Sequence, residues 1–314
     1  MIRKIVLTSI FIFLITYCSL IWFLSGLILF PHASMERTQK RMVEKWGTTY
    51  KKMIAQLPEP TNFSVQSFDG TILKGKYFRK IENADCALIF AHGWTDTWAG
   101  MLKYVSAFED CDCDIIMFNQ RAHDNSGGLY ATGGIKEAKD LLAVTNWLQS
   151  QEGYTDQQIG WVGSSWGAAV VLTAGSYTKN VGFIMADAPF QNWYSAIFER
   201  GVRLIGPVAH VIGSQVMQIV NWRAEIDYTE ASALNVTNQI TEPVLLLHSK
   251  FDSHTAPQQA INIAEKLNKK STFHLLDWGG NHTHDVLFNK EKFKQLVNQF
   301  LRKNAANFLK ERKK

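Results

Sequence analysis

The stretch IGWVGSSWGAA, residues 159–169, decides the fold of this 314-residue chain. Its first half is a short apolar run typical of a buried strand, and small residues suited to a closely packed helix follow the last glycine. Between them lies the pattern G-x-S-x-G, with Gly163, Ser165 and Gly167 at its fixed positions. In a strand–turn–helix setting the pattern lifts a serine hydroxyl above the sheet, on a turn too tight for a Cβ atom at either glycine. The pattern is weak alone and strong in this setting, so we interpret Ser165 as a nucleophile.

The composition excludes several classes of protein. Hydrophobic residues make up 46% and charged residues 19% of the chain, which rules out a disordered or fibrous protein. The formal charge of +5 is mild and partly gathered at the chain ends, so we expect no nucleic-acid partner. We expect neither a cofactor nor a metal ion. The chain has four cysteines, Cys18, Cys86, Cys111 and Cys113. They are too few for a disulfide scaffold and lack the paired spacing of a zinc site. They leave open the redox compartment and the role of the C-x-C pair formed by Cys111 and Cys113.

The N-terminus reads as a membrane segment. Arg3 and Lys4 precede an uncharged run from Ile5 to Phe30, which as a helix would measure about 39 Å, enough to cross a hydrocarbon core of about 30 Å. The run is too long for the apolar region of a secretory signal peptide. We therefore expect an uncleaved signal-anchor, with a cleaved signal peptide or a buried core helix as alternatives. The flanking charges are nearly balanced, and we favour a short cytoplasmic N-terminus with the catalytic domain outside.

The remainder alternates short apolar runs with amphipathic stretches. This order is typical of a mostly parallel, doubly wound α/β sheet covered by helices on both faces. A polar, charged segment follows the anchor, and an apolar insert of the kind that forms a helical lid interrupts the later half. The expected boundaries are an anchor at 1–31, a stalk or linker at 32–61, a core at 62–188 and 241–305, a helical lid at 189–240, and a basic tail at 306–314.

From about Phe63 to Leu301 the chain resembles the α/β-hydrolase superfamily, in particular bacterial membrane-anchored serine hydrolases similar to the prolyl-oligopeptidase-like and serine-aminopeptidase-like groups. The resemblance lies in the "DG..L.G" hairpin after Phe68, the His92-Gly93 loop, the segment from Asn119 to Ser126, and the elbow. It implies a serine hydrolase with a helical lid. The sequence departs from the family pattern at Ala122 and Asp124, where glycines are usual in a structural loop.

A serine nucleophile needs a positioned base and a third group that orients the base. In this fold they follow in the order serine, acid, histidine. Asp252 ends the segment HSKFD, which resembles the family's "HG..D" loop, and His282 ends GGNH, which resembles its "G-x-G-H" loop. Asp252 is thus the expected acid and His282 the expected base. His284 remains an alternative base and Asp187 an alternative acid. A metal site at His282, His284 and Asp285 would explain neither Ser165 nor Asp252.

The backbone N–H groups of Trp94 and Trp166 are the expected oxyanion donors. The apolar lid near an anchor suggests an acyl or lipid-like ester as substrate, with membrane attachment through residues 5–30. A serine peptidase of the aminopeptidase or oligopeptidase type, acting on short peptides, is the alternative enzyme. A non-catalytic binding protein with this fold is the alternative from another class.

Overall fold

The computed structural model describes residues 1–80, 84–178 and 181–310. At the centre of this part of the chain is an eight-stranded sheet with the strand order β1-β2-β4-β3-β5-β6-β7-β8. The hairpin β1–β2 and the pair β2–β4 are antiparallel, and the other neighbouring strands are parallel, which confirms the predicted mostly parallel sheet. The strands are Thr61–Gln66 (β1), Ile72–Phe78 (β2), Ala87–Ala91 (β3), Asp114–Asn119 (β4), Ile159–Ser164 (β5), Phe183–Asp187 (β6), Val244–Ser249 (β7) and Thr272–Leu276 (β8).

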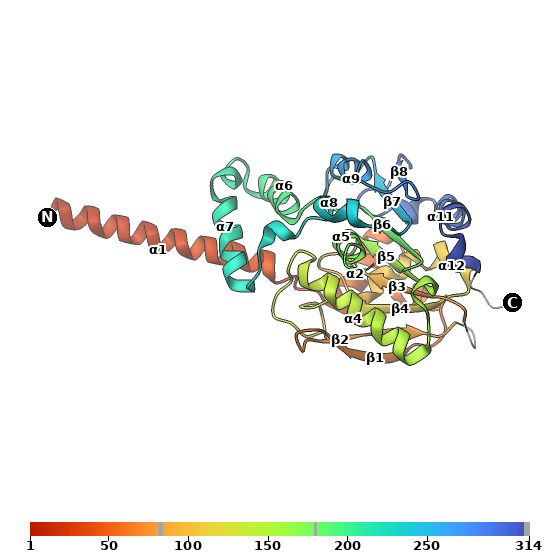
Figure 1. Ribbon diagram of the computed structural model, residues 1–314. Coiled ribbons are helices and arrows are strands. Elements are labelled where there is room, and N and C mark those ends of the chain that lie inside the picture. The colour runs from red at the N-terminus through yellow and green to blue at the C-terminus, as the bar shows by residue number, and fades with distance from the viewer. Residues whose placement is uncertain (81–83, 179–180, 311–314) are drawn as a thin grey trace.

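Helices cover both faces of the sheet (Figure 1). Strand β3 is buried throughout because Ile89 joins the core under α4 and α5 while Phe90 joins the core under η1 and α11. The helices are Ile2–Leu29 (α1), Met35–Trp46 (α2), Tyr50–Ile54 (α3), Trp98–Cys111 (η1), Ile135–Glu152 (α4), Asp156–Gln158 (η2), Trp166–Gly175 (α5), Trp193–Ile205 (α6), Val208–Ala224 (α7), Tyr228–Glu230 (η3), Ala233–Val236 (α8), Thr237–Gln239 (η4), Pro257–Ala264 (α9), Asp285–Phe288 (α10), Lys290–Asn304 (α11) and Ala306–Lys310 (α12).

The segment 32–61, expected to be a stalk, packs against the body instead. Met42 of α2 is completely buried, and Thr38 donates a hydrogen bond to Asp96 at 2.9 Å. Arg41 of the same helix forms an ion pair with Asp96, also at 2.9 Å. The segment is polar overall, which predicts a stalk. Thr38 and Met42 lie one turn apart, so α2 carries a narrow face that docks while its charges stay in water.

The C-terminal segment 306–314 also begins as part of the body. Helix α12 places the Phe308 ring against Phe183 of β6, with 4.8 Å between the ring centroids. The predicted basic character rests on residues that include 311–314, which lie outside the described residues.

Helix α1 is long and apolar enough to cross a membrane, and it projects from the body as an arm (Figure 1). Its side chains are mostly exposed up to Leu20, and from Ile21 onward one face packs along α7. At the end of the helix the N–H of Ala131 donates to the carbonyl of Leu29 at 3.0 Å. The last turns of α1 therefore belong to the hydrophobic core of the body.

A disulfide joins Cys86 and Cys113. The two cysteines directly precede β3 and β4, and the parallel register pairs Ala87 with Asp114, so the sulfurs face each other at the start of adjacent strands. Cys111, the other member of the C-x-C pair, is buried outside this bond. Counting cysteines could not reveal the pairing, because it follows from strand register.

Candidate active site

Ser165 occupies a sharp turn between β5 and α5. Its backbone has φ 55° and ψ −111°, a conformation that side-chain-bearing residues rarely adopt and that the surrounding structure must hold. A Cβ atom on Gly163 would collide with the backbone of Gly167, and one on Gly167 would collide with the carbonyl of Ala91. Both glycines are therefore needed for the close approach of helix and strands, as the sequence pattern predicts.

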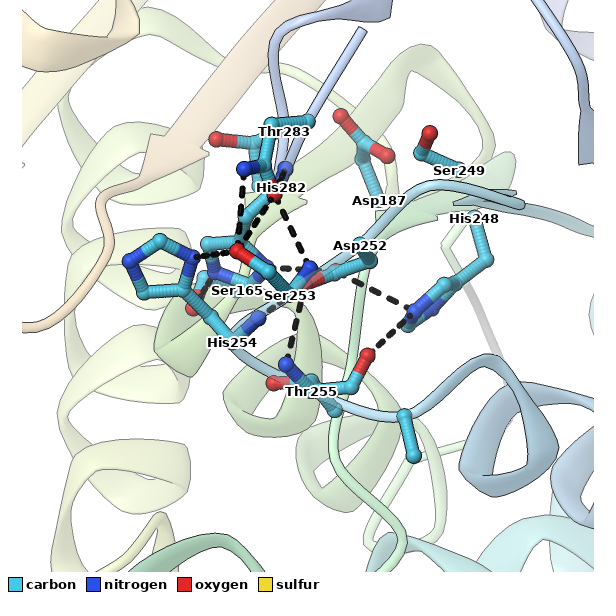
Figure 2. Close-up of polar contacts among 12 residues, drawn as sticks. Ser165, Asp187, His248, Ser249, Asp252, Ser253, His254, Thr255, His282 and Thr283 are labelled. Atoms are coloured by element: carbon cyan, nitrogen blue, oxygen red, sulfur yellow. Dashed lines mark hydrogen bonds and ion pairs between the residues drawn. The ribbon is translucent and has the colours of Figure 1, made fainter. Parts of the chain in front are cut away.

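The structure brings Ser165, His282 and Asp252 into one chain of hydrogen bonds (Figure 2). His282 Nε2 lies 2.7 Å from Ser165 Oγ, and His282 Nδ1 lies 2.6 Å from Asp252 Oδ2. The three side chains come from the elbow, the loop after β7 and the loop after β8. These segments meet because the carboxyl ends of parallel strands lie at one edge of the sheet.

Asp252 is fully buried yet surrounded by donors. Its Oδ1 accepts hydrogen bonds from the backbone N–H groups of His254 and Thr255 at 2.8 and 2.9 Å. Its Oδ2 lies 3.2 Å from His248 Nε2 in addition to its contact with His282. Burial by itself would raise the pKa of Asp252, but the hydrogen bonds from His248 and His282 outweigh it and hold the pKa well below its usual value. The carboxylate is therefore ionised at neutral pH.

Comparison with known proteins places this chain in a family. The sequence model of the prolyl oligopeptidase family (Peptidase_S9) matches residues 119–307, more than half of the chain. The chain belongs to the prolyl oligopeptidase family. It is thus a serine hydrolase of the α/β type. Among curated proteins it is 27% identical over 249 residues to YqkD of Bacillus subtilis (strain 168), an uncharacterized protein, covering 77% of this chain and 79% of that one.

Solved structures of hydrolases share the fold of this family member. The esterase Pf2001 of Pyrococcus furiosus superposes with a TM-score of 0.65 at 25% identity, covering 82% of this chain and 96% of that one. The acylaminoacyl peptidase of Pyrococcus horikoshii gives a TM-score of 0.60 at 18% identity, covering 82% of this chain and 44% of that one. The esterase thus matches over nearly its whole length, whereas this chain spans less than half of the peptidase.

Two residues of this family member contact the acid or the base and were not expected to. His248 is buried beside Asp252 and lies 3.1 Å from the carbonyl of Thr255. Asn281 accepts hydrogen bonds from the N–H groups of His282 at 2.6 Å and Ser253 at 3.0 Å. Asn281 thereby ties the loop of the base to the loop of the acid. The spacing of His248 and Asp252, four residues apart within the motif segment, was the one available signal.

Trp94 and Trp166, whose N–H groups are the expected oxyanion donors, line the same cavity as Ser165. Trp166 is the first residue of α5, so its N–H has no acceptor within the helix. The loop that carries Trp94 is fixed by His92, whose Nδ1 lies 2.9 Å from the Gly93 carbonyl and whose Nε2 accepts from the N–H of Gln120 at 3.0 Å. Burial lowers the pKa of His92 to about 4, so its ring is neutral and serves as a brace for the loop. The Trp94 and Trp166 rings lie 4.7 Å apart.

The family departures at Ala122 and Asp124 keep the geometry that glycine favours. Their φ angles are 61° and 46°, both in the left-handed region. The loop therefore retains its turn at the expense of some backbone strain, and the N–H of Ala122 donates to the carbonyl of Gly127 at 2.8 Å.

The alternative acid and base lie elsewhere in the site. Asp187 ends β6 and accepts a hydrogen bond from Tyr104, and burial raises its pKa. His284 lines the same cavity as Ser165, but burial lowers its pKa to about 4. Within the described part of the chain, neither side chain forms a hydrogen bond with His282 or Ser165. The geometry thus favours Asp252 and His282 for the two roles.

A cavity of about 810 Å³ opens over Ser165 and His282. Aromatic walls come from Trp94, Trp166 and Trp193, the last packed edge-on against Trp166 at 5.7 Å. The size lies within the range of roughly 300–1,000 Å³ that holds small-molecule ligands. Its charged lining is mostly basic: Arg41, Lys45, Lys103, Arg200 and Arg203, against the carboxylate of Asp96.

Proposed function

We propose that the chain is a membrane-anchored hydrolase of carboxylic esters in which Ser165, His282 and Asp252 form the catalytic triad. The hydrogen-bond chain from Ser165 Oγ through the imidazole to Asp252 supports this proposal most directly. It supplies a nucleophile, a base within reach of its proton, and a buried carboxylate that orients the base.

The reaction follows from these contacts. His282 Nε2 takes the proton of Ser165 as Oγ attacks the ester carbonyl carbon, and Asp252 stabilises the imidazolium that forms. The N–H groups of Trp94 and Trp166 stabilise the oxyanion of the tetrahedral intermediate. The C–O bond to the alcohol then breaks, and His282 gives its proton to the leaving oxygen. Water, activated by the same imidazole, releases the acid and restores the serine.

Labelling with a fluorophosphonate probe tests the nucleophile. We expect one adduct on Ser165, located by mass spectrometry of the digested protein, and no adduct on the Ser165→Ala variant. Ser164→Ala is the neighbouring control, since its hydroxyl contacts Tyr104 rather than the base, and it should still be labelled. An unlabelled wild-type protein that binds ligands would instead support the non-catalytic reading.

Ester cleavage is favoured over peptide cleavage by the cavity beside the site, whose walls are aromatic and apolar as well as basic, and by the likeness to an esterase over most of its length. The family match itself keeps peptide cleavage as the competing activity. Parallel assays of p-nitrophenyl esters and aminoacyl p-nitroanilides decide between them. Faster turnover of the anilides would overturn the ester assignment while leaving the triad intact.

Helix α1 is proposed as an uncleaved anchor with the catalytic domain on the extracytoplasmic side. The burial of Ile21, Ile28 and Leu29 in the body argues that the helix stays attached. The disulfide between Cys86 and Cys113 fits an oxidising compartment, because such bonds do not persist in a reducing cytosol. Protease treatment of intact cells tests the orientation, since an external domain should be digested and a cytoplasmic one protected.

A further inference from the structure

A second cavity lies between the anchor and the lid. It measures about 310 Å³ and is walled mainly by apolar side chains of α1, α6 and α7, including Leu24, Ile28, Phe198, Ile212 and Met217. This volume is at the lower end of the range for small-molecule sites. None of the residues that form the triad lines this cavity, and Trp94 is the one residue of the mechanism above among its walls.

The apolar cavity adjoins the catalytic cavity. The two share wall residues of the oxyanion loop and of α6, namely Trp94, Thr95, Ile197, Arg200 and Leu204. A long, flexible substrate could therefore occupy both cavities, with its reacting carbonyl at Ser165 and an apolar chain between the helices.

The anchor directs the apolar cavity toward the bilayer. The exposed part of α1, Ile2 to Leu20, would measure roughly 28 Å at 1.5 Å per residue, close to the ~30 Å of a hydrocarbon core. The bilayer would then end where α1 meets α7, beside the cavity. The turn between α6 and α7 carries the exposed apolar side chains of Leu204, Ile205, Val208 and Val211. Trp222, near the other end of α7, is exposed beside the Trp22 ring of α1, with 5.9 Å between the ring centroids. Exposed apolar patches of this kind are suited to a membrane surface.

Arg223 fixes this arrangement. Its guanidinium lies 4.1 Å from the centroid of the Trp22 ring and donates to the Trp22 carbonyl at 3.1 Å and to Ser25 Oγ at 2.8 Å. The anchor and α7 are thus joined by polar contacts in an otherwise apolar junction. The wall that α1 contributes to the cavity is part of the folded structure.

The basic side chains of the catalytic cavity differ in whether a neighbouring group pairs with them. Arg41 is neutralised by Asp96, and Arg203 donates to the His254 carbonyl at 2.6 Å. Arg200 lines both cavities and, among the described residues, has no carboxylate within ion-pairing distance. A free cation at the junction of an apolar pocket and a reactive serine suits a substrate with an anionic group.

We propose that this protein cleaves acyl esters of anionic membrane lipids, with the acyl chain held between α1, α6 and α7 and the anionic headgroup beside Arg200. The proposal rests on the esterase function proposed above. In the reaction the ester C–O bond breaks after attack by Ser165, the headgroup alcohol leaves with a proton from His282, and water releases the fatty acid.

Acyl-chain length tests the apolar cavity. With full-length protein in a neutral detergent and p-nitrophenyl esters from acetate to palmitate, kcat/KM should rise about fourfold for each buried methylene until the cavity is full. Gly213 of α7 lines the cavity with space around it, since a Cβ there would meet only ordinary contacts at 3.7 Å. Gly213→Leu should lower the ratio of long-chain to short-chain kcat/KM at least tenfold. Ser214→Leu, on the exposed face of the same helix, is the matched control and should leave the ratio unchanged.

A comparison of lipids with different headgroup charge tests the proposed role of Arg200. Phosphatidylglycerol should be hydrolysed faster than phosphatidylcholine of the same acyl chains in the same detergent. Arg200→Gln should lower this preference about two- to fivefold, the effect of one exposed charge, while Lys269→Gln on the surface should not. Equal rates for the two lipids, or the same chain-length profile for Gly213→Leu and Ser214→Leu, would overturn the proposal. Fluorophosphonate labelling and melting temperature establish that each variant is folded. Loss of labelling and of all ester hydrolysis in the wild type would count against the esterase function itself.

Discussion

Replacing Asp252 with asparagine tests the catalytic assignment most directly, because the two side chains share a shape and differ in charge and hydrogen bonding. Asp252 Oδ1 accepts from the N–H groups of His254 and Thr255 at 2.8 and 2.9 Å, and Oδ2 faces His282 Nδ1 at 2.6 Å. Asparagine keeps both backbone hydrogen bonds only if its carbonyl oxygen takes the place of Oδ1. Its amide N–H groups then face His282.

This exchange of acceptor for donor changes the tautomer of the base. His282 would present an unprotonated Nδ1 to the amide and carry its proton on Nε2, which lies 2.7 Å from Ser165 Oγ. That nitrogen could no longer accept the serine proton. The opposite rotamer would place the amide N–H groups against the backbone N–H groups of His254 and Thr255, so it is also unfavourable. We expect kcat to fall about 10⁴-fold, equivalent to about 5 kcal/mol of barrier.

The assay is hydrolysis of p-nitrophenyl acetate by full-length protein in neutral detergent, with circular dichroism and melting temperature as checks of the fold. Asp112→Asn is the matched control, since Asp112 is exposed and precedes β4 at the edge of the sheet remote from Ser165. It should leave kcat unchanged. A folded Asp252→Asn variant that retains more than a tenth of wild-type kcat would refute the role given to this carboxylate.

Three further predictions concern the surroundings of the site. Asn281→Ala should free the loop of His282 and lower kcat about tenfold or more with little change in KM, measured by steady-state kinetics on the acetate ester; an unchanged kcat would remove its positioning role. Burial lowers the pKa of Lys103 to about 8, so the folded state binds this proton less tightly than the unfolded state, and stability should rise from pH 8 toward pH 10. Lys103→Met should remove that rise, up to about 3 kcal/mol, in urea unfolding curves, and a slope equal to that of the wild type would contradict the argument. Deleting residues 2–20 should leave the unfolding free energy nearly unchanged. Deleting residues 2–31 should lower it by roughly 5 kcal/mol or more, because this removes the buried side chains of Ile21, Ile28 and Leu29. Equal stabilities of the two truncated proteins would refute the packing role of α1.

Local sequence signals carried most of the fold. The apolar runs marked the strands from β3 to β7, which are buried throughout, because strands buried on both faces are largely apolar. The elbow glycines marked the nucleophile because the turn tolerates no Cβ atom there. The chain order of serine, acid and histidine then identified Asp252 and His282, which the structure brings to Ser165.

Contacts between distant segments could not be predicted in the same way. The docking of α2 depends on Asp96, which lies 58 residues from Thr38 along the chain. The pairing of Cys86 with Cys113 depends on the register of β3 and β4. The contact between His248 and Asp252 depends on how the chain turns after β7. A local residue pattern predicts local structure, whereas these contacts join segments that only the tertiary structure brings together.

Helix α1 combines a local sequence signal with tertiary contacts that the sequence did not predict. From sequence, α1 is a membrane span and the lid is a separate insert. In the structure the last turns of α1 enter the core, its face packs along α7, and Arg223 binds Trp22 and Ser25. Movement of α7 away from α1 would break these contacts. Under the proposed anchoring through α1, we expect substrate to reach Ser165 from the membrane side along the apolar cavity, so that molecules dissolved in the bilayer need not cross water.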